Sequence, residues 1–241
     1  MNKKPIVLYK APVVGVILLF ISIAVQPSIA TIQPEKKIDE EPKDYLFQTI
    51  IKIANNPDVT SLLERYNHEL FTSDYDYKSV FSQLLFKKPG LLLGFLCTKP
   101  YITFDYLDKC YNKGIEITKI IGENKALEMI ESIKKSKQSD LDEMNNIILN
   151  NEELSERIEI LKEMNKEFSP ITPSQYNPII CGILILITIP PVVIFWFFAL
   201  LASIFQNNPT IFEFLSAIGS IFLGIAVVLI FAMAALDCIP V

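Results

Sequence analysis

Residues 179–236 read IICGILILITIPPVVIFWFFALLASIFQNNPTIFEFLSAIGSIFLGIAVVLIFAMAAL. Two long apolar runs, Ile179–Phe205 and Ile211–Leu236, are separated by the polar break at 206–210. The first run carries no charged residue and the second carries only Glu213. Uncharged runs of about 20 residues or more are typical of helices that span a lipid bilayer. The pattern therefore predicts a C-terminal transmembrane hairpin.

The first run is longer than a straight spanning helix needs. At about 1.5 Å per residue it would extend about 40 Å, against about 30 Å of hydrocarbon in a bilayer. Pro190 and Pro191 lie near its middle and predict a kink there, because each proline removes an amide donor. In transporters such broken helices line substrate sites. The absence of charged or amide side chains near this break favours the accommodation of excess length instead.

The second run has two local patterns. Thr210 and Glu213 have the spacing of a capping box, which predicts that Thr210 caps the helix. Ser216, Ser220 and Gly224 recur every four residues and predict a helix-packing stripe, since small residues allow two helices to approach closely. The preceding helix is the expected partner of the stripe, and a second copy of the chain is the alternative.

Residues 1–30 have the pattern of an export signal. Lys3, Lys4 and Lys10 form a positively charged region that precedes an uncharged apolar run, Ala11–Val25, and small residues follow the run at 28–30. A cleaved signal peptide and an uncleaved N-terminal signal anchor are both compatible with this pattern. Both predict that the chain from residue 31 onward lies on the extracytoplasmic side, because the lysines stay inside.

The segment 44–168 has the pattern of an all-α domain. Apolar residues recur at spacings of three and four, and Pro, Gly or Asn pairs interrupt the short helices. We expect, for example, a helix capped by Thr103 that ends at Gly114, and a further helix that ends at Gly122. The chain has 22 Lys+Arg and 27 Asp+Glu, and this mixed surface is not that of a nucleic-acid-binding protein.

Two stretches of the domain have alternative interpretations. Residues 53–60 resemble 148–155, since a helix end is followed in each by two asparagines and an acidic first turn. This is either a repeat of helical hairpins or ordinary capping. Leu91–Cys97 contains no polar side chain. It is either a core helix or a segment that dips into the outer leaflet, and we favour the core helix.

The four cysteines allow three pairings. In an antiparallel hairpin, Cys181 and Cys238 lie at the same end and on the oxidising side of the membrane. Cys97 and Cys110 both lie in the outer domain. We therefore predict the candidate disulfides Cys181–Cys238 and Cys97–Cys110, with four free buried thiols as the alternative.

No residues with the pattern of a catalytic, cofactor-binding or metal site are found. His68 is the single histidine, so a histidine-dependent nucleophile would rest on one residue, which we interpret as a surface side chain. The acidic stretch 140–145 lacks the glycine and the closing glutamate of a calcium loop. Phosphate-binding glycine loops and zinc-protease motifs are also absent from the sequence.

We therefore expect an all-α protein with a helical (hairpin-type) domain and a C-terminal two-helix transmembrane hairpin, multi-pass in the cell membrane with its main domain outside. The expected function is non-enzymatic: a module for protein interaction or complex assembly, with membrane lipid and another membrane or extracytoplasmic protein as partners. We expect that the protein binds neither nucleic acid nor a cofactor. A homo-oligomer is compatible with the sequence. The expected segments are a signal peptide or anchor (1–30), a polar linker (31–43), the helical domain (44–168), a proline-rich connector (169–178), a spanning helix (179–205), a cytoplasmic turn (206–210), a second spanning helix (211–236) and an outer tail (237–241).

Two other functional classes are retained. A small subunit of a transporter or channel would need polar groups facing a pore, and the hairpin offers only the hydroxyls of Thr188, Ser203, Ser216 and Ser220. An enzyme would need an unrecognised acidic site assembled from distant helices.

Overall fold

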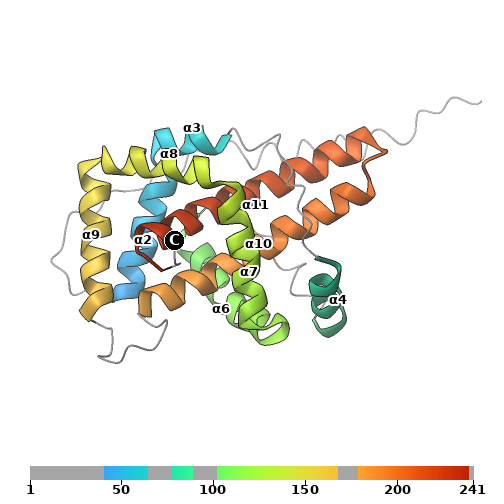
Figure 1. Cartoon of the computed structure of the whole chain (residues 1–241), viewed down its shortest axis with the longest axis horizontal. Helices are drawn as coiled ribbons and strands as arrows, with labels where there is room; N and C mark the ends of the chain where they lie inside the picture. Colours follow the sequence, from blue (N-terminus) through green and yellow to red (C-terminus); the bar gives the residue numbers. More distant parts are fainter. Residues whose placement is uncertain (1–40, 65–76, 89–101, 168–178, 239–241) are drawn as a thin grey trace, which may run out of the picture. The chain divides into compact units, whose positions relative to one another are not determined.

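The computed structural model describes residues 41–64, 77–88, 102–167 and 179–238 (Figure 1). Every regular element in these ranges is a helix, which confirms the all-α class for this part of the chain. In chain order the helices are α2 (Pro42–Ala54), α3 (Pro57–Glu64), α4 (Tyr77–Lys87), α6 (Phe104–Ile121), α7 (Glu123–Ser136), α8 (Gln138–Leu149), α9 (Glu152–Glu167), α10 (Ile179–Ile204) and α11 (Pro209–Ala235).

The two apolar runs form α10 and α11, which pack against each other as an antiparallel pair (Figure 1). Both helices are long and apolar enough to cross a membrane, with a mean hydropathy of 2.6 in each. Helix α10 continues through Pro190 and Pro191 without interruption. Length and composition alone do not separate a spanning helix from the core helix of a protein that never contacts lipid. The packing around the pair is therefore the informative observation.

The hairpin forms the centre of the hydrophobic core. After α11, the helix that α10 contacts most extensively is α6, and α2, α7, α8 and α9 also pack on the hairpin. Its large side chains Trp196, Phe195 and Phe231 are at most 2% exposed. The described residues, 41–238 with their gaps, belong to one compact unit. The helices on either side of the expected connector, which itself lies outside the described residues, therefore share one core.

Helices α6 and α10 approach most closely at Gly114. A Cβ placed on Gly114 would lie 1.9 Å from the carbonyl oxygen of Leu186, so only a glycine fits. Leu186 is four residues before Pro190, which has no N–H to donate to that carbonyl. The Leu186 carbonyl instead lies against the position that a side chain at Gly114 would occupy.

This crossing explains why the prediction of a helix end at Gly114 was wrong. Helix α6 continues from Phe104 to Ile121, because a glycine inside a helix is tolerated where a second backbone must come close. The expected cap at the start of α6 is confirmed, since the Thr103 hydroxyl accepts a hydrogen bond from the Tyr106 amide at 3.2 Å. Helix α6 ends at its cap residue Gly122, as predicted, and Gly122 has a φ of 89°. Helix α2 begins at Pro42, two residues earlier than expected.

The two similar asparagine-containing stretches are both helix caps. The Asn56 side-chain oxygen accepts hydrogen bonds from the amides of Asp58 and Val59 at 2.9 and 3.2 Å. The Asn151 side-chain oxygen accepts one from the Leu154 amide at 3.1 Å. Asparagine is among the preferred capping residues, so capping chemistry accounts for the resemblance.

Polar contacts fix α2 against its neighbours. Lys43 forms an ion pair with Asp108 of α6, with 2.5 Å between the Nζ and Oδ1 atoms. On the other side, Arg157 of α9 donates from Nε to the Thr49 hydroxyl at 3.2 Å and stacks over the Tyr45 ring at 4.4 Å. A guanidinium suits this position because it can stack and donate at once. These contacts set the position of α9, which lines the pocket described below.

The α6–α10 crossing can be tested with Gly114→Ala. The added methyl group would collide with the Leu186 backbone, and we expect overpacking of this kind to lower the free energy of unfolding by about 1–3 kcal/mol. Gly224→Ala is the matched control, because its Cβ would lie 3.8 Å from the Leu63 Cδ2, an ordinary contact. Denaturant unfolding followed by circular dichroism measures both. An equal loss in the two variants would contradict the steric explanation.

Candidate functional site

One end of the hairpin is apolar and exposed. Here we call residues 203–221, which contain the turn between α10 and α11, the exposed end. It contains a single charged side chain, Glu213. Its large apolar side chains are unusually accessible: Ile204 is 61% exposed, Phe205 43%, Ile211 38%, Phe214 39% and Ile221 40%. Several large apolar side chains are therefore accessible at this end of the hairpin, and exposed apolar surface can mark a site of interaction with a membrane or another protein.

The turn in the exposed end is well formed. Asn208 is the cap of α11, since its side-chain oxygen accepts from the Ile211 amide at 3.4 Å, and Pro209 occupies the first helical position. The prediction that Thr210 caps this helix with Glu213 was therefore wrong. Proline at the first turn needs no amide partner, so the helix starts two residues earlier than the capping-box pattern indicated.

The opposite end of the hairpin is cross-linked. Cys181 and Cys238 lie at disulfide distance, with 1.94 Å between sulfur atoms and 5.2 Å between Cα atoms, in the arrangement predicted from the sequence. The Asn165 amide donates to the Cys181 sulfur at 3.4 Å, which connects the end of α9 to this pair. The hairpin base is thus held to the surrounding helices.

The C-terminal turn of α11 directs Cys238 toward Cys181. Asp237 has a φ of 55°, and its amide bonds to the Ala234 carbonyl at 3.2 Å. The Cys238 amide bonds to the Met233 carbonyl at 2.8 Å. This is a Schellman motif, with aspartate in the left-handed position that glycine usually occupies. Aspartate adopts that conformation more readily than most residues.

One position of the predicted stripe of small residues, Gly224, has a different neighbour from the expected helix α10. A Cβ on Gly224 would meet Leu63 of α3, so this position faces α3. The hydroxyls of Ser216 and Ser220 donate to carbonyls of their own helix, Phe212 at 2.7 Å and Ser216 at 2.8 Å. Thr188 and Ser203 do the same within α10, so all four hydroxyls considered for a pore donate to their own helix.

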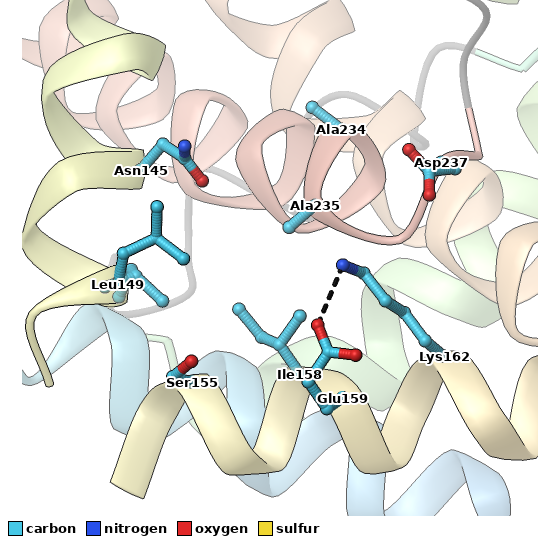
Figure 2. A pocket seen from close by; sticks show the side chains of 10 residues that line it. Asn145, Leu149, Ser155, Ile158, Glu159, Lys162, Ala234, Ala235 and Asp237 are labelled. Carbon is cyan, nitrogen blue, oxygen red and sulfur yellow. Dashed lines mark hydrogen bonds and ion pairs between the residues drawn. The ribbon is translucent and has the colours of Figure 1, made fainter. Parts of the chain in front are cut away.

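A small pocket of about 190 Å³ lies where α8 and α9 meet the end of α11 (Figure 2). Ligand pockets for drug-sized molecules are usually about 300–1,000 Å³, so this one has room for little more than one or two side chains. It is lined by Asn145, Ile148, Leu149, Ser155, Ile158, Glu159, Lys162, Ala234, Ala235 and Asp237.

Charged side chains line one side of the pocket, and an apolar side chain lies at its edge. Lys162 and Glu159 form an ion pair at 3.0 Å, and Asp237 lies across from Lys162 (Figure 2). Leu149 is 62% exposed, the most exposed large apolar side chain in the described ranges. The pocket thus has a charged side and an exposed apolar side chain next to it.

The remaining described cysteine has an unreactive thiol. Cys110 is free and buried, and its predicted partner, Cys97, lies outside the described residues. Burial raises the pKa of the Cys110 thiol to about 12. Burial, and then Cys110, raise the pKa of Tyr106 well above its ordinary value. Both groups are therefore neutral at physiological pH, and Cys110 is not a nucleophile there.

Other candidates cannot be placed or do not assemble. His68, the stretch 91–97 and the export signal lie outside the described residues. Within those ranges, no group of three or more His, Cys, Asp or Glu side chains is arranged to hold a metal ion. No family model, curated protein or solved structure matches the chain. The functional argument therefore depends on the exposed end, the cross-linked base and the pocket.

The cross-link should contribute to stability. Replacement of Cys181 and Cys238 by serine opens a loop of 57 residues, and we expect the free energy of unfolding to fall by about 2–4 kcal/mol. Denaturant unfolding measures the loss, and mobility on a non-reducing gel reports the bond itself. Cys110→Ala is the control, since it should leave the mobility unchanged. An unchanged stability without the pair would show that packing alone holds the base.

Proposed function

We propose that this chain is a membrane-associated helical protein without enzymatic activity, and that it holds another protein at the membrane surface. The observation that carries the proposal is the division along the hairpin. Its base is enclosed by amphipathic helices, while its exposed end presents Ile204, Phe205, Phe214 and Ile221 to the surroundings. The exposed end attaches the protein to the membrane, and the outer helices receive the partner.

The charge distribution supports membrane attachment. Residues 179–236 contain one charged side chain in two helices with a mean hydropathy of 2.6. The outer helices, by contrast, carry ion pairs such as Lys43–Asp108 and Lys109–Asp105 on their accessible faces. Charged faces prefer water and apolar faces prefer lipid, so the two parts suit different surroundings.

The partner surface is centred on Leu149 and the adjacent pocket. Interfaces typically have a few apolar anchors surrounded by polar groups. Leu149 supplies the anchor, and Glu159, Lys162 and Asp237 supply charged groups beside it. A pocket of about 190 Å³ accepts one side chain of a partner.

The cysteines and the N-terminal pattern support the proposed side of the membrane. Disulfides persist in oxidising compartments. The geometry of Cys181 and Cys238 supports an extracytoplasmic location for the hairpin base, in agreement with the signal at residues 1–30. In this proposal the amphipathic helices lie on the same side.

Attachment and side are tested together in cells. We expect the full chain to sediment with membranes, and its Cys181–Cys238 pair to resist thiol labelling until a reductant is added. A variant without residues 1–30 should keep both cysteines reduced and reactive, because it stays in the reducing cytoplasm. A protein that is found in the soluble fraction, or whose pair is reduced in the full chain, would overturn this part of the proposal.

The partner surface is tested by Leu149→Glu. A charge at the anchor should abolish co-purification of the partner from mild detergent, as identified by mass spectrometry, because the apolar contact is lost. Glu128→Ala, at an exposed position of α7, is the control and should retain the partner. Recovery of the same proteins with both variants would contradict the assignment of this surface.

A further inference from the structure

The pocket beside Leu149 has one wall that comes from the end of α11. Ala234, Ala235 and Asp237 form this wall, which we call the α11 wall, and residues of α8 and α9 form the other sides (Figure 2). Ala234 and Ala235 belong to the last turn of the helix, whereas Asp237 lies beyond it. Helix ends fray readily. The shape of the pocket therefore depends on what holds the end of α11 in place.

The turn that ends α11 lacks two features that usually stabilise a Schellman motif. The left-handed residue of the motif is most often glycine, but here it is Asp237 with a φ of 55°. The next residue frequently contributes an apolar side chain that packs back on the helix, but here it is the small side chain of Cys238. Cys238 is 4% exposed, and its sulfur is bonded to Cys181. A covalent bond thus takes the place of the usual packing contact.

The same cysteine pair also contacts the helix on the opposite side of the pocket. Cys181, in the first turn of α10, accepts a hydrogen bond from the Asn165 amide of α9 at 3.4 Å. Asn165 lies three residues after Lys162 and seven after Ile158, so it shares a side of α9 with these two pocket-lining residues. The pair therefore connects the α11 wall with the part of α9 that faces it.

We propose that the pocket is completed only when Cys181 and Cys238 are joined, so that binding of a partner there requires prior oxidation of the pair. In the reduced chain, only backbone hydrogen bonds and the buried side chain of Leu236 hold Asp237 in its unfavourable conformation. The turn then relaxes, and the α11 wall moves away from Lys162. This inference rests on the proposed function, since it concerns the regulation of the proposed partner surface.

The oxidant for this step is a protein or small-molecule disulfide of an oxidising compartment. The thiols of Cys181 and Cys238 transfer two electrons and two protons to that disulfide. One S–S bond forms within the chain, while the S–S bond of the oxidant breaks to give two thiols. A chain that has not been exported stays reduced and lacks the completed pocket. Oxidation of the pair thus restricts partner binding to the extracytoplasmic side.

Hydrogen exchange and chemical labelling test both sides of the pocket in the purified full-length protein. The protein is kept in mild detergent, with the pair either intact or reduced by a phosphine. In the reduced protein we expect the backbone amides of 236–238 to exchange about tenfold faster or more, because the turn opens locally. Lys162 should become several-fold more reactive toward an acetylating reagent, because the α11 wall no longer covers it. Lys166, an exposed lysine of the same helix, is the reference.

Two variants separate control of the pocket from a general loss of stability. Gly114→Ala weakens the α6–α10 crossing while the pair is intact, so exchange at 236–238 and labelling of Lys162 should not change. Asp237→Gly supplies the residue that a Schellman turn prefers. In the reduced protein, Asp237→Gly should therefore restore most of the slow exchange at 236–238. Equal effects of reduction and of Gly114→Ala would overturn the inference.

Cysteine variants assign the effect to this pair. Cys181→Ser together with Cys238→Ser should reproduce the behaviour of the reduced chain without any reductant. If this variant does not fold, the chemically reduced protein gives the same measurement. Cys110→Ala should respond to the reductant like the unmodified chain, since its buried thiol is not part of the pair. A response to the reductant that persists in the double serine variant would assign the effect to another cysteine and overturn the inference.

A binding arm uses the proteins that co-purify with the unmodified chain but not with Leu149→Glu. We expect the double serine variant to lose the same proteins and Gly114→Ala to keep them. Retention of these proteins without the bond, or equal exchange rates in the two redox states, would overturn the inference and leave the proposed function intact. If no co-purifying protein depends on Leu149, the proposed partner surface fails, whereas exchange and labelling still decide whether the pair controls the pocket.

Discussion

The contact between Gly114 and the Leu186 carbonyl determines how the amphipathic helices meet the apolar hairpin. A side chain at position 114 would separate α6 from α10 and remove the closest approach in the core. Pro190 contributes by leaving the Leu186 carbonyl without its helical donor, so that this oxygen faces α6 at no cost to a regular hydrogen bond. The positions of α2 and α7 depend on α6 in turn, through Lys43–Asp108 and the reversal at Gly122. One glycine and one proline thus join two segments that are far apart in the chain.

The two ends of the hairpin are built in opposite ways. At the base, the Schellman turn at Asp237, the Cys181–Cys238 pair and the Asn165 amide hold both helix ends to α9. At the exposed end, the polar groups of the turn are satisfied by the Asn208 cap, and the neighbouring apolar side chains are accessible. The hairpin is cross-linked at its base and accessible at its exposed end. This arrangement is suited to present the exposed end to a surface while the base stays rigid.

The polar groups of the hairpin have structural roles. Thr188, Ser203, Ser216 and Ser220 donate to carbonyls of their own helices, as hydroxyls in apolar surroundings commonly do. Cys110 is kept as a thiol by burial. Among the described residues, the groups best placed to interact with other molecules are Leu149, the charged side of its pocket and the exposed end of the hairpin. Both surfaces are suited to binding, and this is the basis of the functional proposal.

The sequence by itself determined the helical class, the bounds of α10 and α11 to within a few residues, the Thr103 cap and the pairing of Cys181 with Cys238, because periodicity, capping and chain direction are local properties. It did not determine what surrounds the hairpin. A run such as Ile179–Ile204 is equally suited to lipid and to a protein core, since both are apolar. Only the tertiary structure decided that α6, α2 and α8 pack on one part of the hairpin, whereas Ile204 and Ile221 at its other end are exposed. The reason is that Gly114 permits close packing because it lies opposite Leu186, and only the folded protein brings these two residues together. When the sequence is read by itself, Gly114 resembles a residue that ends a helix.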